Sequence, residues 1–514
     1  IHQGAPKISN MHKKVELYTL YIIYLFIIYC SLSIGTAWDE VPEILRGNER
    51  LKYLFALGSF ENYWKEINDE FYPGFYTTIV SFFTKMMPIK YEYEAWHLTN
   101  SLFSLLTVFG IYKISIKLFN KKVAKIIFLL CLFNPIFFGH MAINPKDPII
   151  AFANVWTTYI FLRYLQNQDN NEKSFRYILL AGLTIGLGTG VRIPFLITLV
   201  PFFIFSLVDI LFLKKLVHSN FSFKKFILHL VLVLVLAYIL TILFWPHVHS
   251  NILTEPTRLF FLLIETMNNQ IFGLPWMLFN GKMIEINNPN TFYLISNFFY
   301  KTPEFILLCY VFSVYLFFFK IEFFRESFEH FKNKLFLVIF IFLFPVMYFM
   351  ITNHIIYDGL RLYLYLIPYY SIIPGLVIYY LISNFDKLIN KIILVFTSIS
   401  ALYFLYVFVI LTPYHYTYLN SFAGNFSSSY KKFENDYWGV SIKELTQKIK
   451  KESILKTDGS TVKIVFCGLS PQVGKRELNK IRNLKFEVHS LYDDDFDYVI
   501  MTNSIVGEQE NNTL

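Results

Sequence analysis

The sequence predicts a polytopic α-helical membrane protein of about eleven transmembrane helices, followed by a small extracytoplasmic α/β domain. Apolar residues make up 55% of the 514 residues and aromatic residues 19%, whereas only 16% are charged. A soluble domain has about 25% charged residues, and the mean hydropathy here is +0.44. Many apolar runs approach the length needed to cross a hydrocarbon core of about 30 Å. These observations exclude a water-soluble globular protein.

Eleven apolar segments are interpreted as membrane spans. They define a transmembrane domain over residues 17–411, between a cytoplasmic N-terminus (1–16) and an extracytoplasmic tail (412–514). The first span follows the basic pair Lys13-Lys14 and is too long for a cleaved signal peptide, so we expect it to remain as an anchor. The predicted bounds are 17–37, 95–112, 123–139, 148–166, 177–190, 193–213, 226–245, 304–320, 335–352, 362–381 and 390–411.

The distribution of Lys and Arg predicts the orientation of these spans. The net charge of +9 could suggest nucleic acid in a soluble chain, but in a membrane protein the basic surplus belongs in cytoplasmic loops, so no nucleic-acid partner is expected. With a cytoplasmic N-terminus, every cytoplasmic connection is basic, whereas the short outer connections carry one basic residue each, Lys146, Arg192 and Arg361. The basic connections are 113–125, 163–176, 214–225, 320–334 and 387–391.

This orientation predicts two large outer loops, 38–94 and 246–303. Counting residues 72–88 as a span would place the lysine cluster 113–125 outside, so 72–88 is interpreted as an interfacial or re-entrant helix with Lys85 and Lys90 near the headgroups.

The tail is predicted to be a small α/β module. Alternating apolar residues predict strands at 461–467, 484–489 and 497–502 and a short helix at 474–482. Three of the four cysteines lie inside apolar runs, and no Cys/His metal spacing is present.

The first candidate functional residues are acidic and lie at the predicted outer membrane boundary. Asp39 and Glu40 follow Trp38 directly after the first span. Carboxylates at such a boundary are costly unless they are solvated, paired or used, and an acidic headgroup-level cap is an equally good explanation of this pair alone. In the next short outer connection, Asp147 is expected to be the N-cap of the following helix, but capping does not explain the adjacent Lys146.

Three further outer connections carry polar groups. Arg192 lies amid mostly apolar sequence, where a charge usually faces a cavity or a partner. His247 follows the seventh span, and Asp358 and Arg361 precede the tenth. The predicted topology therefore places all five constellations on one face of the membrane.

Acids and bases gathered there suit a membrane-embedded substrate whose phosphate lies at headgroup level. A carboxylate can take a proton from an acceptor or hold a cation, and Lys or Arg can hold phosphate oxygens. A lipid-linked phosphosugar fits this description, with an acceptor hydroxyl or amine displacing the lipid phosphate at the anomeric carbon. The protein would supply positioning, cations and one base.

The chain resembles the GT-C glycosyltransferases of family 39, the bacterial type of dolichyl-phosphate-mannose protein mannosyltransferase-like proteins. The resemblance covers most of the chain and depends on the order of short motifs rather than on any single one. The most telling are Trp38-Asp39-Glu40, the segment Phe138-Gly139-His140 to Asn144-Pro145-Lys146-Asp147-Pro148, and Tyr357-Asp358-Gly359-Leu360-Arg361. Supporting pieces are Leu274-Pro275-Trp276, Lys301-Thr302-Pro303, Pro413-Tyr414-His415-Tyr416 through Asn420, and Phe433-Glu434-Asn435-Asp436-Tyr437-Trp438-Gly439.

The resemblance implies a polyprenyl-phosphate sugar donor and a catalytic set. Asp39 matches the family's proposed base, with Glu40 beside it, and Asp147 matches the acidic residue of the next outer loop. Some members of the superfamily use a divalent cation, so the sequence leaves open whether this chain binds one. The predicted substrate-binding set rests instead on electrostatics, and comprises Lys146, Arg192, His247, Asp358 and Arg361. The loop 246–303 has fewer than 60 residues, too few for the β-trefoil insertion of the eukaryotic O-mannosyltransferases.

The predicted function is a hexosyl- or pentosyltransferase in a bacterial cytoplasmic membrane, with its active site facing outward and a protein, lipid or glycan acceptor. A secondary transporter is one alternative, but transporters place ionisable groups near the bilayer midplane, whereas here they lie at the span ends. A flippase for a lipid-linked glycan is another, and it gives no reason for Asp39.

Overall fold

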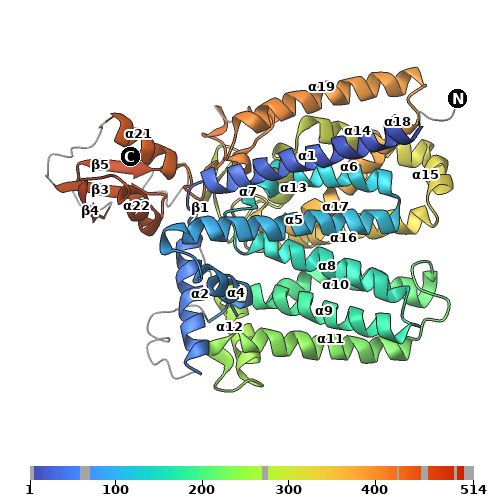
Figure 1. Cartoon of the computed structure of the whole chain (residues 1–514), viewed down its shortest axis with the longest axis horizontal. Helices are drawn as coiled ribbons and strands as arrows, with labels where there is room; N and C mark the ends of the chain where they lie inside the picture. The colour runs from blue at the N-terminus through green and yellow to red at the C-terminus, as the bar shows by residue number, and fades with distance from the viewer. Residues whose placement is uncertain are drawn as a thin grey trace.

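The computed structural model describes residues 5–57, 70–268, 276–424, 428–452, 461–490 and 495–502. Leu274-Pro275 of one supporting motif lies outside these residues. Helices dominate the bundle, and strands occur in one hairpin and in the C-terminal module (Figure 1). The predicted fold class is thereby confirmed.

Within the described residues, eight helical segments are long and apolar enough to cross a membrane. They comprise residues 14–33 of α1 (Ala5–Ser33), η1 (Ile89–Tyr91) with α5 (Glu92–Leu118), α9 (Asn171–Val191), α10 (Phe195–Val208) with η2 (Asp209–Leu213), α11 (Phe223–Leu243), α16 (Phe331–Thr352), η4 (Arg361–Leu366) with α17 (Ile367–Tyr370) and α18 (Ile372–Ser383), and α19 (Leu388–Ile410). The count is nine if α13 (Tyr293–Tyr300) and α14 (Glu304–Phe319), which meet at a bend of 114°, form one span.

The two other predicted spans are helical but do not meet this test of length and apolarity. Residues 123–139 form α6 (Lys121–Leu132) and α7 (Pro135–His140), separated at Asn134, whose side chain caps α7. Residues 148–166 lie in α8 (Asp147–Leu165), which is buried along most of its length. A helix enclosed by other helices can carry polar residues, and α6 and α8 both pack alongside α5 (Figure 1).

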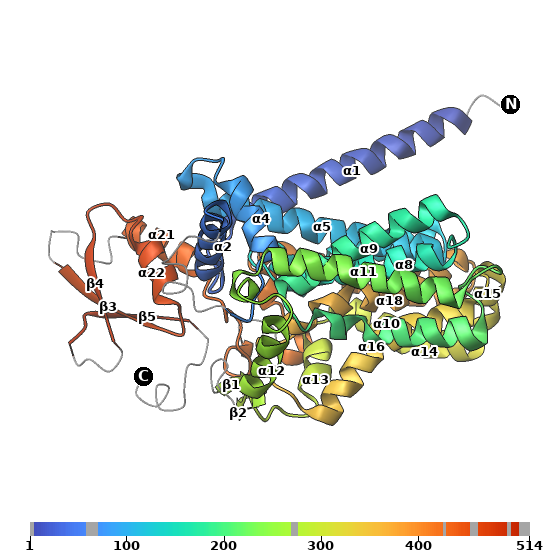
Figure 2. The same cartoon turned by 90° about the horizontal axis from the view of Figure 1, so that it is seen from below.

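The bundle has two chemically different ends. The predicted basic connections, including α15 (Ile321–Ser327), lie at one end, and the C-terminal module lies at the other (Figure 1). The same far end carries α2 (Glu40–Phe55), α12 (Glu255–Asn268) and the antiparallel hairpin of β1 (Trp276–Phe279) and β2 (Lys282–Glu285) (Figures 1 and 2).

Helix α2 runs across the bundle axis and packs on α4 (Phe75–Thr84) (Figure 1). The two are joined by Arg50, which is fully buried and donates hydrogen bonds to the Thr77 hydroxyl and the Tyr72 carbonyl. The 10 residues of α4 extend about 15 Å, half the thickness of a hydrocarbon core, in keeping with the interfacial or re-entrant segment predicted at 72–88.

The tail begins with η5 (His415–Thr417) and η6 (Ser421–Ala423) and continues into an α/β module. Its three parallel strands lie in the order β4-β3-β5, and its elements are α21 (Ile442–Glu452), β3 (Thr461–Cys467), α22 (Pro471–Leu478), β4 (Lys485–His489) and β5 (Tyr498–Met501). All three predicted strands are present. The helix begins three residues earlier than predicted, because Pro471 suits a first helical turn.

Specific contacts attach this module to the bundle. Lys443 Nζ donates to the carbonyls of Leu32 and Ile34 at 3.0 and 2.9 Å, so it satisfies acceptors at the end of α1. The Arg476 guanidinium lies 3.2 Å from the ring centroid of Tyr93 in α5. The module therefore holds the end of α1, immediately before Asp39.

Candidate active site

Ion pairs at the end of the bundle that carries the C-terminal module join charged side chains from four connections between helices. Arg361 lies at their centre. Its Nη1 is 2.9 Å from Asp358 Oδ2 and 3.6 Å from Asp39 Oδ2, and its Nε is 3.7 Å from Asp147 Oδ2. We call the following residues the charged cluster: Asp39, Glu43, Lys146, Asp147, Arg192, Asp358 and Arg361.

Lys146 forms the second bridge within the cluster. Its Nζ lies 3.6 Å from Asp39 Oδ2 and 2.9 Å from Glu43 Oε1. It also lies 4.8 Å from the ring centroid of Tyr72, whose carbonyl is held by Arg50. Glu43 was not predicted as a site residue. It follows Asp39 by one helical turn on α2, a spacing that places both side chains on one face once the helix is known.

Asp147 faces Arg192, with 2.8 Å between Oδ1 and Nη1. The expectation that Asp147 is a helix N-cap is wrong, because α8 already begins at Asp147. The Asn144 side chain instead accepts hydrogen bonds from the backbone N–H groups of Lys146 and Asp147, both at 3.0 Å. Its Nδ2 donates to Asp147 Oδ2 at 2.9 Å, so the carboxylate is free of the capping role and can face two arginines.

Glu40 and His247 are placed differently from the other predicted residues. Glu40 is buried and pairs with His97 Nε2 at 2.7 Å, while its other oxygen accepts the Ala37 N–H at 2.6 Å. His247 lies in η3 (Pro246–Val248), which packs against α2. The ion pairs of the charged cluster are formed by other residues.

A segment of the tail also contacts the cluster. The Arg361 guanidinium lies between two rings, 4.9 Å from the centroid of Tyr357 and 5.0 Å from that of Trp438. Trp438 also hydrogen-bonds to Asp358. Tyr437 Oη lies 2.7 Å from Nε2 of the buried His140. These contacts were not predicted, because Trp438 lies 77 residues after Arg361 and Tyr437 lies 297 residues after His140 in the sequence.

The environment of each carboxylate determines its protonation. Burial alone would raise the pKa of Asp39, but the charges of Lys146 and Arg361 lower it to about 2. Burial raises the pKa of Asp358 to about 6, against the opposing charge of Arg361. Asp39 is therefore ionised at neutral pH. Its side chain is 25% exposed, compared with 3%, 6% and 15% for Glu43, Asp147 and Asp358, so it is the carboxylate of the cluster most accessible to a substrate.

The arrangement of the His, Cys, Asp and Glu side chains shows whether they could hold a metal ion. Among the described residues, no group of three or more His, Cys, Asp or Glu side chains is arranged to hold a metal ion. Three cluster carboxylates instead face the guanidinium of Arg361.

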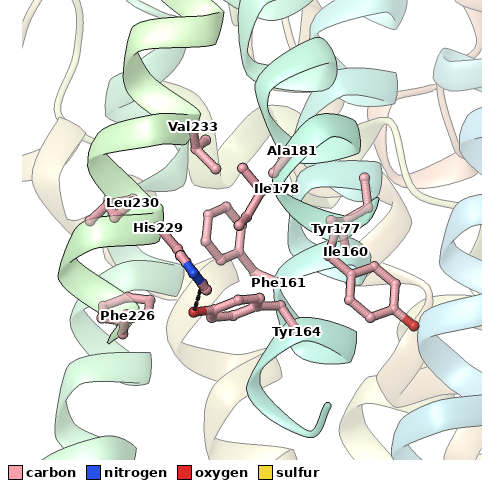
Figure 3. A pocket seen from close by; sticks show the side chains of 10 residues that line it. All are labelled: Ile160, Phe161, Tyr164, Tyr177, Ile178, Ala181, Phe226, His229, Leu230 and Val233. Atoms are coloured by element: carbon pink, nitrogen blue, oxygen red, sulfur yellow. Dashed lines mark hydrogen bonds between the residues drawn. The ribbon is translucent and has the colours of Figure 1, made fainter. Parts of the chain in front are cut away.

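Two cavities lie away from the cluster. One, between α8, α9 and α11, is lined by apolar and aromatic side chains around the hydrogen bond from Tyr164 to His229 (Figure 3). Its volume of about 10 Å³ admits no more than one water molecule. The other, about 410 Å³, lies between α2 and α4 and is lined mainly by Leu and Phe side chains. It suits hydrocarbon rather than sugar.

The chain is similar to known proteins in part of its sequence and in its fold. Residues 75–245 match the family model described as dolichyl-phosphate-mannose-protein mannosyltransferase. The apo crystal structure of ArnT from Cupriavidus metallidurans matches 94% of this chain and 87% of its own, with 12% identity and a TM-score of 0.53. The chain has the GT-C fold. The apo oligosaccharyltransferase from Archaeoglobus fulgidus matches 91% of this GT-C chain and 64% of its own, with 12% identity and a TM-score of 0.49.

No curated protein matches the sequence of this GT-C chain. The matched segment 75–245 contains three cluster residues, Lys146, Asp147 and Arg192, and excludes Asp39 and Arg361. The GT-C fold that the motifs predicted is confirmed, and residues 75–245 match the family model, whereas the roles of individual residues are proposals.

Proposed function

We propose that the chain is a membrane glycosyltransferase that moves a sugar from a polyprenyl-phosphate donor to an acceptor on the outer side of a bacterial cytoplasmic membrane. Asp39 is the general base, and Lys146, Arg192 and Arg361 hold the phosphate that leaves. Asp147 and Asp358 orient Arg192 and Arg361 through their ion pairs. The acceptor is a protein, lipid or glycan.

One observation carries the proposal: acids and cations from four separate connections meet at the end of the bundle opposite its basic connections. A lipid phosphate at headgroup level would reach them there. The GT-C fold supports this function, and ArnT from Cupriavidus metallidurans has also been crystallised with undecaprenyl phosphate. A transporter or a flippase would not need a partly exposed carboxylate held between two cations.

The reaction proceeds by displacement at the anomeric carbon. The acceptor oxygen or nitrogen forms a bond to that carbon while the bond from carbon to phosphate oxygen breaks. The acceptor proton moves to Asp39. The bonding electron pair leaves with the polyprenyl phosphate, whose negative charge increases. Cations placed where charge develops lower the barrier, because they need no reorganisation during the reaction.

Donor binding would also strengthen the base. Lys146 and Arg361 lower the pKa of Asp39 to about 2, which makes it a weak base. A donor phosphate that shares these two cations brings its own negative charge close to Asp39. Both effects raise the pKa of the carboxylate toward a value better suited to proton transfer. Asp39 therefore becomes an effective base only when the donor is present.

Mass spectrometry of lipid that co-purifies with the full chain tests the donor class. The expected finding is a polyprenyl phosphate or its sugar adduct. If only phospholipid co-purifies and added undecaprenyl phosphate does not bind, the proposal is wrong.

The role of Asp39 is tested with the donor so identified. Asp39→Asn should bind it yet transfer its sugar at least about 10²-fold more slowly, the scale of general-base catalysis. Glu285→Gln, which alters an exposed acid on β2, serves as the control and should retain the wild-type rate. Transfer by Asp39→Asn at the wild-type rate would remove Asp39 from the mechanism.

A further inference from the structure

A buried lysine lies next to the charged cluster without belonging to its ion-pair network. Lys301 occupies the break between α13 and α14 and is only 4% exposed. Within the part of the chain that the structure describes, no carboxylate oxygen lies within 4.0 Å of its Nζ, whereas Lys146, Arg192 and Arg361 all have such a partner. Its Nζ lies 5.6 Å from the ring centroid of Tyr437. A buried ammonium is costly without a closer counter-charge.

The side chain is directed at the turn that leads to Arg361. Asp358 and Gly359 both have a positive φ, of 56° and 64°. The Gly359 N–H donates to the Tyr293 hydroxyl of α13 at 2.9 Å. A Cβ added at Gly359 would lie 2.9 Å from Lys301 Cε and 3.1 Å from its Nζ. The absence of a side chain at Gly359 is therefore what lets the ammonium lie against this turn.

The backbone around Lys301 is held in place from the tail. The Asn420 side chain donates to the carbonyls of Phe299 and Thr302, at 2.7 and 3.0 Å. The Asn420 N–H donates to the Tyr300 carbonyl at 2.8 Å. Carbonyls on both sides of Lys301 are thus fixed by one residue, and the position of the lysine is determined by the fold.

We propose that Lys301 is a further donor-binding residue, whose ammonium contacts a phosphate oxygen of the polyprenyl-phosphate donor beside Arg361. This inference rests on the proposed function. The cations of the cluster are already neutralised by carboxylates, so an incoming phosphate has to compete for them. Lys301 offers a charge with no such competitor within 4.0 Å among the described residues.

The charge of the lipid phosphate changes during the reaction, and this predicts when Lys301 acts. The donor is a phosphodiester with one negative charge, whereas the leaving polyprenyl phosphate is a monoester that carries between one and a half and two at neutral pH, as a phosphorylated side chain does. An additional cation stabilises the second state more than the first. Lys301 should therefore contribute to kcat and to binding of the lipid phosphate product more than to donor binding.

Equilibrium binding of undecaprenyl phosphate to the purified full chain in detergent tests the assignment. Lys301→Met should bind this probe at least about tenfold more weakly than the wild type, and Lys301→Arg should recover part of the loss. Lys431→Met is the control, because Lys431 is an exposed lysine in the C-terminal tail, and it should bind normally. Undecaprenol, which lacks the phosphate, should bind all four proteins equally.

The outcomes separate the two proposals. If the wild type binds undecaprenyl phosphate and Lys301→Met binds it equally well, the role of Lys301 is wrong and the proposed function stands. If the wild type does not bind it, the proposed function itself fails. If inorganic phosphate alone binds in a Lys301-dependent way and undecaprenyl phosphate does not, the residue serves a free anion instead. Thermal unfolding shows whether each variant is folded, and Lys301→Gln replaces Lys301→Met if the latter is not.

Discussion

Asp39 and Glu40 are adjacent in the sequence, yet their carboxylates face different partners. Asp39 Oδ2 lies 3.6 Å from both Lys146 Nζ and Arg361 Nη1, whereas Glu40 Oε1 lies 2.7 Å from His97 Nε2 on α5. Successive residues at the start of a helix point about 100° apart. One carboxylate of the pair therefore faces the charged cluster, and the other joins α2 to the bundle.

This difference predicts opposite consequences for two conservative substitutions. Glu40→Gln should lower the free energy of unfolding by about 3 kcal/mol, because it breaks a buried pair, while folded protein keeps its sugar-transfer activity. Asp39→Asn should slow transfer by at least about 10²-fold, with a smaller effect on stability. Thermal unfolding in detergent, together with activity per folded molecule, measures both. Loss of transfer in a fully folded Glu40→Gln protein would instead place Glu40 in the catalytic set.

The pKa values of two cluster carboxylates predict opposite pH dependences of stability. Burial raises the pKa of Asp358 from 3.8 to about 6, so the folded protein binds this proton more tightly than the unfolded chain. Its contribution to stability therefore falls as pH rises from about 4 to 6, by about 3 kcal/mol, and then levels off. The pKa of Asp39 is lowered to about 2, so its contribution is present above pH 4 and is lost as pH falls toward 2.

Thermal unfolding of wild type and Asp358→Asn between pH 4 and 8 measures the first of these effects. The stability of the wild type relative to the variant should decrease up to about pH 6 and then stay constant. Asp169→Asn, at an exposed position in the basic end of the bundle, is the control and should give a curve parallel to the wild type. A parallel curve for Asp358→Asn would contradict the raised pKa.

Alanine substitutions at two glycines with positive φ separate the effect of backbone strain from the effect of displacing the Lys301 side chain. Gly281 has a φ of 76°, and a Cβ there would meet only the Lys431 carbonyl at 3.8 Å. Gly281→Ala should therefore cost about 1 kcal/mol of stability through strain alone. Gly359→Ala adds a contact with Lys301 at about 3 Å. We expect both variants to be destabilised, and only Gly359→Ala to bind undecaprenyl phosphate more weakly. Equal binding by the two would contradict the placement of Lys301.

Several features could be predicted because they depend on short stretches of sequence. The spans follow from runs of apolar residues, and the separation of basic from mixed connections follows from Lys and Arg alone. The three tail strands followed from alternation over five to seven residues. The same reasoning placed Asp39, Asp147 and Arg361 at one end of the bundle, where ion pairs join them.

Other features could not be predicted, because they depend on side-chain direction. Glu40 was grouped with Asp39 by adjacency, but the helix that begins there turns it toward His97. Asp147 was expected to cap α8, but it is the first residue of the helix, and the Asn144 side chain accepts its backbone N–H. Glu43 lies within a segment interpreted only as a loop.

The sequence by itself determined a membrane-embedded chain with one basic end and a set of acids and cations at the other, because hydropathy and charge add up residue by residue. Only the tertiary structure decided which of these charges meet, since an ion pair requires two side chains to converge within about 4 Å from helices far apart in the chain. Packing thus selected Arg361 as the centre of the cluster, brought Trp438 over it, and left Lys301 buried beside it without a carboxylate among the described residues within that distance.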